Sequence, residues 1–178
     1  MPESDSIKRE RLRLAKTYKS HNLRTWSETK ETLSHEWIEN RLTHKGRQIL
    51  RGGIYMCHLG DNIGDEHGKH RPVLVVSNEL INKTSGNVSV VPLTTNLKKK
   101  AIIDPQTKRV IKYLDKPRYK SHYFLWKSKY GFLDDNSATV CEEVKTVSKV
   151  RLGKHKGDIS LTDLNKVLRC IDWVVGLR

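Results

Sequence analysis

An arginine and two threonines stand where predicted strands meet loops, and their chemistry suits a phosphodiester ligand. Arg71 follows a glycine-rich polar loop and opens the apolar run 72–76, while Thr94 and Thr95 close the next apolar run, 88–93. An arginine keeps its charge in proteins, and its planar fork matches two phosphate oxygens at once. Threonine hydroxyls can donate hydrogen bonds to the same group. These residues predict a site that holds a phosphodiester and stabilises its developing charge.

The loop before Arg71 carries side chains that could move protons. Glu66, His67 and His70 lie there, and a histidine can act as base or acid near neutral pH. Transfer of a phosphodiester needs a base, an acid and a cation, so side chains alone could supply the reaction. The residues leave open which group is the acid and which the base. A solvated loop without a catalytic role is the alternative.

No metal or cofactor site is predicted. The spacing of His58, His67 and His70 matches no standard metal signature. The three cysteines lie far apart without a C-x-x-C pair, which argues against a disulfide framework or a zinc knuckle and favours a reducing cytoplasm. No apolar run approaches membrane-spanning length. We therefore expect a cytoplasmic protein without a membrane partner.

Half of the formal net charge of +14 lies in the segment 98–120, which has nine lysine and arginine residues against two aspartates. Such a balance favours a polyanionic partner, because neutralising phosphates releases condensed counterions. Single-stranded RNA is also bound by aromatic side chains on which its bases stack. The residues expected to contact RNA are Thr95, His70, Lys98, Lys99, Lys100, Arg109 and Tyr119. A solvated surface loop is the alternative for this segment.

The elements that must position these residues change type along the chain. Residues 1–49 read as helical, with one helix over 7–18 and a second from an N-cap at Ser27 to Leu42. From Gly53 onward, short β-rich runs between Gly, Asn, Asp and Pro predict a small, strongly bent sheet or barrel. These runs are 54–58, 72–77, 88–93, 121–126 and 138–143, with a possible further strand over 110–114.

Two helices carry apolar stripes. The second N-terminal helix has a stripe that must be covered by the sheet, a second copy or a partner: Leu33, Trp37, Ile38 and Leu42. The chain closes with a helix that Ser160 caps and Gly176 ends. Its predicted apolar face is Leu161, Leu164, Leu168, Ile171 and Val175.

The run 73–76 has no polar face and predicts a central strand. The fold class is α+β, mainly β with helices.

Several blocks of the sequence, in the right order, resemble the MazF/PemK family of bacterial toxin endoribonucleases. Residues 51–55 correspond to the family's RGDIY-like strand, and residues 64–68 to its GSEQG-like loop. Residues 71–75 correspond to its RPVLV motif, and residues 92–95 to its Thr-Ser-like strand end. Its YGL, LLEQIRTID and RLG blocks are similar to 130–133, 138–146 and 151–153. The resemblance covers about residues 50–176.

The resemblance implies a fold and several residue roles. It implies a small SH3-like, PemK-type β-barrel with a C-terminal helix over 50–178. A helical extension over 1–49 and a basic insertion at about 97–118 fall outside the resemblance. It also implies that Arg71 is catalytic and that Thr94 is catalytic or substrate-binding. Glu142 matches an acidic position near the family's active site. Some family members have a histidine before the loop glutamate, where this chain has Asp65, and His67 replaces the usual glutamine.

The implied activity is that of a toxin in a toxin–antitoxin pair. Such a protein forms a homodimer, is neutralised by a cognate antitoxin, and cuts single-stranded RNA without a metal, leaving a 2′,3′-cyclic phosphate and a 5′-hydroxyl. Two alternatives keep the fold but drop the chemistry: a toxin that inhibits DNA gyrase by binding it, and a non-catalytic RNA-binding module. Because every matching block begins at or after about Arg51, we expect catalysis to survive deletion of residues 1–49.

Overall fold

The computed structural model describes residues 4–177, so the first three residues of the extension and the last residue of the chain lie outside the description. The described helices are α1 (Asp5–Glu39), α2 (Arg41–Gly46), α3 (Glu79–Thr84) and α4 (Leu161–Val174), with 3₁₀ turns η1 (Cys141–Glu143) and η2 (Lys149–Arg151). The strands are β1 (Gly53–Gly60), β2 (Lys69–Val75), β3 (Asn87–Thr94), β4 (Lys99–Ile103), β5 (Val110–Pro117), β6 (His122–Leu125), β7 (Ser137–Val140), β8 (Lys145–Ser148) and β9 (Leu152–Asp158). The mixed α+β class is confirmed.

The main sheet is antiparallel and open. Its strand order is β6-β7-β3-β2-β1-β9, and β8 also pairs with β3. Because β2 lies between β3 and β1, and Val73, Leu74 and Val75 are buried, the predicted central strand is confirmed.

The predicted closed barrel is wrong. β3 pairs with β8 through residues 87–90 and with β7 through residues 93–94, so the sheet bends along β3. Within residues 4–177, however, the edge strands β6 and β9 do not pair with each other. Closure depends on pairing between strands far apart in sequence, which local patterns do not encode.

Buried side chains cover both faces of the sheet. One cluster joins Ile54 and Leu74 to Leu164 and Val167 of α4, and a second contains Val73 and its neighbours on β1, β3 and β8. Ser160 caps α4 as predicted, because its hydroxyl accepts a hydrogen bond from the amide of Asp163 at 3.3 Å. Gly176, at φ +78°, follows the end of that helix.

The apolar face of α4 differs from the prediction at its two ends. Leu161 and Val175 are exposed, and Val167 is buried in their place. The buried residues of α4 are Asp163, Leu164 and Val167, all in its first half.

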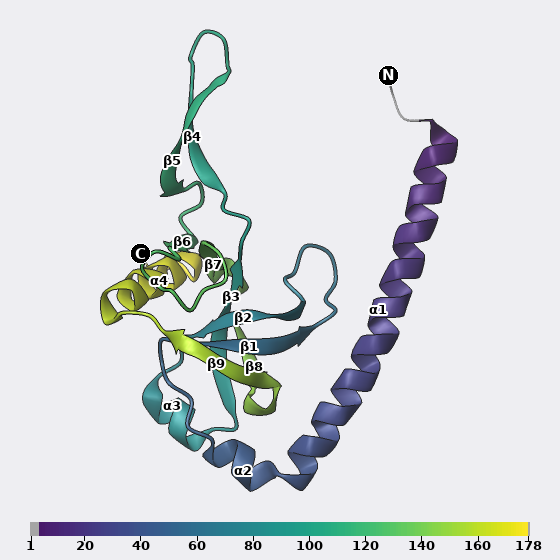
Figure 1. The fold of residues 1–178 in the computed structure, drawn as a ribbon, viewed down its shortest axis with the longest axis vertical. Coiled ribbons are helices and arrows are strands. Elements are labelled where there is room, and N and C mark those ends of the chain that lie inside the picture. The colour runs from purple at the N-terminus through teal and green to yellow at the C-terminus, as the bar shows by residue number, and fades with distance from the viewer. Residues whose placement is uncertain (1–3, 178) are drawn as a thin grey trace.

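The N-terminal extension is one long helix and one short one, not two helices divided at Ser27. Ser27 is an exposed residue in the middle of α1, and the cap that begins the helix is Ser4. A serine followed by helix-favouring residues resembles a cap in sequence, although here the helix simply continues through it. In Figure 1, α1 runs beside the sheet and its N-terminal half extends away from it.

The predicted stripe on this extension is split. Leu33 and Trp37 face the body of the protein, whereas Ile38 and Leu42 are 73% and 84% exposed. Trp37 packs against Gly86, where any side chain would collide with its ring. Successive helical residues point about 100° apart, so Ile38 lies at the solvent-exposed edge of the surface that Trp37 covers. Within residues 4–177, no helix is apolar over a membrane-spanning length.

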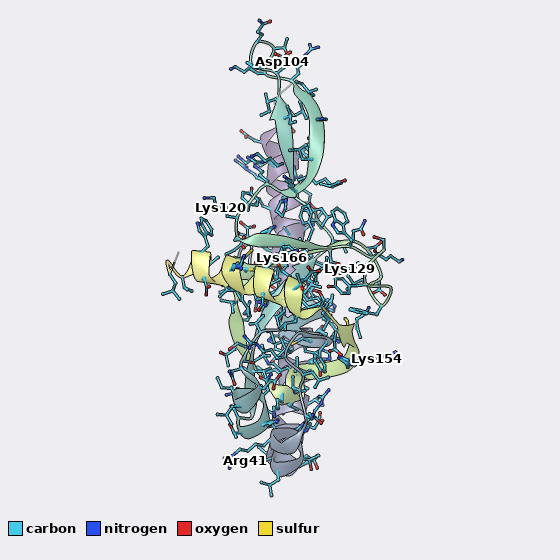
Figure 2. The ribbon with its side chains drawn as sticks, turned by 90° about the vertical axis from the view of Figure 1, so that its left-hand side faces the viewer. Arg41, Asp104, Lys120, Lys129, Lys154 and Lys166 are labelled. Carbon is cyan, nitrogen blue, oxygen red and sulfur yellow. The ribbon has the colours of Figure 1, made fainter. Side chains whose placement is uncertain are left out.

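The basic segment is a two-stranded hairpin. Within the described residues, β4 and β5 pair only with each other, and they project from the body (Figure 1), with Asp104 at the tip (Figure 2). The predicted strand over 110–114 therefore exists and extends to Pro117.

The end of the extension packs into the body. Ile49 is 4% exposed, and the fully buried Lys149 ammonium donates to the carbonyls of Lys45 and Arg47 at 2.7 and 2.9 Å. Arg47 in turn donates to the carbonyl of Gly153 at 2.8 Å. A division at 49/50 stays a prediction, but these contacts favour a boundary nearer residue 40.

Candidate functional site

Arg71 and Thr94 meet at one edge of the sheet. Val73 pairs with Pro92 in the antiparallel β2–β3 register, and two residues further along each strand the same register brings Arg71 opposite Thr94. Both side chains line an open pocket of about 270 Å³, together with Thr95 and Ser137. The structure thus brings together the arginine and both threonines selected from the sequence.

The Arg71 guanidinium is fixed at one nitrogen. Its Nε donates to the carbonyl of Gly68 at 2.7 Å, and within residues 4–177 no hydrogen bond is formed by its two terminal nitrogens. Partial burial lowers the pKa of Arg71, and the charge of Glu143 opposes that shift. Because arginine titrates far above neutral pH, the side chain remains a cation. Its free nitrogens can therefore receive an anion.

The two threonines offer hydroxyls beside that cation. The Thr94 oxygen accepts a hydrogen bond from the amide of Asn96 at 3.2 Å, which holds the turn after β3. A hydroxyl that accepts one bond still has its own proton to donate. Thr95 is exposed at the mouth of the pocket. Both hydroxyls are placed to contact an oxyanion held by Arg71.

A histidine–carboxylate pair lies beside Arg71. One oxygen of Glu143 accepts the backbone amide of His67 at 2.7 Å, and the other contacts the ring nitrogen Nδ1. The same carboxylate lies 3.8 Å from the ammonium of Lys145. With Nδ1 engaged, Nε2 is the ring atom left to exchange a proton with a ligand.

Glu143 is the acidic residue that faces this cluster, although the sequence pointed to its neighbour. Glu142 contacts Nε2 of the buried His122 at 3.0 Å, whereas Glu143 contacts His67. Both glutamates belong to η1, and successive side chains of a 3₁₀ turn point about a third of a turn apart. The sequence showed an acidic pair but not which member would turn inward.

Neither of two other loop candidates lines the Arg71 pocket. Glu66 is exposed, and His70 stacks on His58 with ring centroids 4.3 Å apart. That stack faces α1 and contributes to a different cleft. Among residues 4–177, no group of three or more His, Cys, Asp or Glu side chains is arranged to hold a metal ion.

The basic residues chosen from the sequence lie on or beside the β4–β5 hairpin. Lys98, Lys100 and Arg109 are exposed. Lys99 pairs with Asp115 at 2.6 Å, and Arg118 lies 5.5 Å above the ring of Tyr119 at the hairpin base. Because β4 starts shortly after Thr95, this basic surface continues directly from the pocket.

Comparison with known proteins identifies the family. A family model described as "PemK-like, MazF-like toxin of type II toxin-antitoxin system" matches residues 50–175. The chain belongs to this toxin family. It is 30% identical over 130 residues to Endoribonuclease MazF of Staphylococcus saprophyticus, a match that covers 73% of this chain and 93% of that one. A Staphylococcus epidermidis Endoribonuclease MazF is 29% identical over the same shares. These relatives confirm the predicted enzyme class, an endoribonuclease.

Solved structures share the fold. MazF from Deinococcus radiodurans superposes with a TM-score of 0.53 at 15% identity, covering 73% of this MazF-like chain and 98% of that one. An endoribonuclease from mycobacterial species, solved in complex with its cognate antitoxin, gives a TM-score of 0.51 at 22% identity and covers 73% and 97% of the two chains. The family match begins after α1 and α2, so the long N-terminal helix is an addition to the MazF-like body.

Proposed function

We propose that this MazF-like toxin cleaves single-stranded RNA at a short sequence, using the ribose 2′-hydroxyl as nucleophile and no metal ion. The observation that carries the proposal is the Arg71 pocket, where a cation with free nitrogens faces the hydroxyls of Thr94 and Thr95. His67, on the adjacent loop, is paired with Glu143 of η1. Together these groups match the needs of phosphodiester transfer.

The chemistry assigns a task to each group. Arg71 and Thr94 bind the non-bridging oxygens of the scissile phosphate and stabilise the charge that grows as the 2′-oxygen attacks phosphorus. The new bond joins the 2′-oxygen to phosphorus, and the bond from phosphorus to the 5′-oxygen breaks. The attacking hydroxyl loses a proton and the leaving oxygen gains one. His67, with Nδ1 held by Glu143, carries out one of these transfers through Nε2.

The nucleophile comes from the substrate because the 2′-oxygen is already tethered beside the phosphorus. Such intramolecular groups have a large proximity advantage over free water. We expect products that end in a 2′,3′-cyclic phosphate and a 5′-hydroxyl, and cleavage that continues in excess EDTA. Replacing only the ribose before the scissile phosphate by deoxyribose should abolish cutting. Products with a 5′-phosphate would contradict this mechanism.

The partners follow from the family. A relative has been solved in complex with its cognate antitoxin, and we propose that a cognate antitoxin also neutralises this chain. We further propose that the protein acts as a cytoplasmic homodimer. Size measurement of the purified protein, alone and with the product of the neighbouring gene, tests both points.

Arg71→Ala gives the decisive test of the function. Loss of one donor to transition-state charge reduces turnover by roughly 100-fold to 1,000-fold, while RNA binding through the rest of the basic surface should persist. Arg169→Ala, on the exposed side of α4, is a matched control that should cut normally. Near-normal cleavage by a folded Arg71→Ala protein would remove Arg71 from the mechanism. Binding of RNA without cleavage by the unaltered protein would favour a non-catalytic module.

A further inference from the structure

A second cleft lies between α1 and the β1–β2 hairpin, where the added helix meets the family fold. It has a volume of about 340 Å³, near the lower limit of ligand pockets. Ring-bearing side chains line both of its walls: Tyr18, His21 and Trp26 from α1, and His58 and His70 from the hairpin. No residue from the Arg71 pocket lines this cleft.

The rings are held in place by their surroundings. His58 and His70 stack at 26° to each other, and burial lowers the pKa of His58, so its ring is neutral at neutral pH. On the opposite wall, Trp26 lies over Gly60, where a side chain would come within 2.7 Å of the indole. The guanidinium of Arg151 lies 5.2 Å above the same indole. These contacts hold planar surfaces on both walls.

A cation lies at the edge of the cleft. The ammonium of Lys69 is 5.9 Å from the centre of the Tyr18 ring. Lys69 is one of two described non-glycine residues with positive φ, at +66°, a conformation that costs free energy and often marks a functional position. A charged group beside stacking rings suits a ligand that has both a planar base and a phosphate.

Contacts from α1 join this cleft to the catalytic loop. Lys19 forms an ion pair with Asp61 at 3.0 Å and also contacts the carbonyl of Asn62. The Asn62 side chain donates to the carbonyl of His67 at 2.8 Å. His70 and Arg71 are consecutive in β2, so their side chains point to opposite faces of the sheet. A strand bound at Arg71 would therefore reach the cleft by passing around the 61–68 loop, which contacts both α1 and Glu143.

We propose that the cleft binds one unpaired base of the RNA substrate, next to the nucleotides held at Arg71, with Lys69 contacting its phosphate. The proposal rests on the proposed RNA cleavage. Sequence-selective proteins bind splayed RNA bases on aromatic planes, and a protein with a net charge of +14 attracts a polyanion. The added helix then contributes to base preference as well as to structure.

The test combines Tyr18→Ala with His21→Ala. Both side chains lie on exposed positions of a long helix that alanine favours. Leu14→Ala combined with Leu23→Ala is the matched control, because these exposed residues lie on α1 outside the cleft. Base preference is measured by cleavage of an RNA pool with random sequence. Affinity is measured by fluorescence anisotropy of a labelled RNA in an Arg71→Ala background, which binds without cutting.

Loss of a stacked base should weaken binding roughly fivefold or more and reduce the preference at one position beside the cut. A 4-thiouridine RNA should also cross-link to residues of the cleft. Unchanged affinity and unchanged base preference in the double variant would overturn the proposal. So would intact RNA binding combined with lost antitoxin binding, which would assign the cleft to a protein ligand.

The two proposals can fail separately. If the unaltered protein cross-links RNA in the cleft but never cuts it, the catalytic assignment fails and the base site stands. If the protein cuts RNA and the double variant cuts with the same preference and KM, only the base site is refuted.

Discussion

Two truncations that differ by ten residues should have very different effects on stability. A chain that begins at residue 40 loses α1 but keeps α2 and the segment 45–49 that packs into the body. A chain that begins at residue 50 also loses Ile49 and the carbonyls of Lys45 and Arg47. We expect the first chain to fold and the second to be close to unfolding.

The structure allows the difference in unfolding free energy between the two truncated chains to be estimated. Lys149 has no exposed surface, and its ammonium donates to both lost carbonyls. Hydrogen bonds to a charged group each stabilise by about 1.5–3 kcal/mol, and burying an isoleucine side chain such as Ile49 contributes about 1.5–3 kcal/mol. The loss is therefore about 5 kcal/mol or more. Domains of this size have unfolding free energies of only about 5–15 kcal/mol.

Urea unfolding followed by the fluorescence of Trp126 and Trp173 measures the two midpoints. Lys149→Met should raise the midpoint of the 50–178 chain, because it removes an ammonium that has lost its acceptors. The same change should destabilise the full chain, where that ammonium is paired. Lys154→Met, at an exposed site on β9, is the control. Equal midpoints for the two truncations, or no rescue by Lys149→Met, would refute this reasoning.

Two further predictions concern the site and the hairpin. Glu143→Gln should lower kcat roughly 10-fold to 100-fold, because a neutral amide holds the His67 ring less firmly than a carboxylate does. Glu142→Gln should leave kcat unchanged, and a normal kcat for Glu143→Gln would exclude the pair from catalysis. Replacing the hairpin cations by glutamine should reduce the salt slope of RNA binding by about 0.7 per lost phosphate contact and leave base preference unchanged. Lys154→Gln, the control, should change neither the slope nor the base preference. An unchanged slope would show that the hairpin does not meet the RNA backbone. The cations to replace are Lys98, Lys99, Lys100, Lys108 and Arg109.

Features encoded by neighbouring residues could be predicted from the sequence. The apolar run 73–76 has no polar face, and it is a central strand. Ser160 caps α4, because a serine hydroxyl satisfies an amide that the helix leaves free. Arg71 and Thr94 were chosen from strand boundaries, and strand register brings them into one pocket.

Features that depend on distant parts of the chain could not be predicted in this way. Barrel closure requires β6 to pair with β9, and the open sheet places them at opposite edges. Trp26 is an ordinary helix residue in sequence, and only the folded chain shows it lying over Gly60. Glu143 was indistinguishable from Glu142 until the direction of η1 was known.

The distribution of charge indicates different roles for the N-terminal extension, the basic hairpin and the rest of the chain. The segment 1–49 carries eleven lysine and arginine residues against seven acidic ones, and 98–120 carries nine against two, so the rest of the chain contributes only +3 of the net +14. The Arg71 pocket and its histidine–carboxylate pair belong to that nearly neutral body. Because long-range attraction depends on net charge and chemistry on local geometry, changes in the hairpin should affect association and its salt dependence. Changes in the pocket should affect turnover, and α1 should influence both because Lys19 contacts the loop that carries His67.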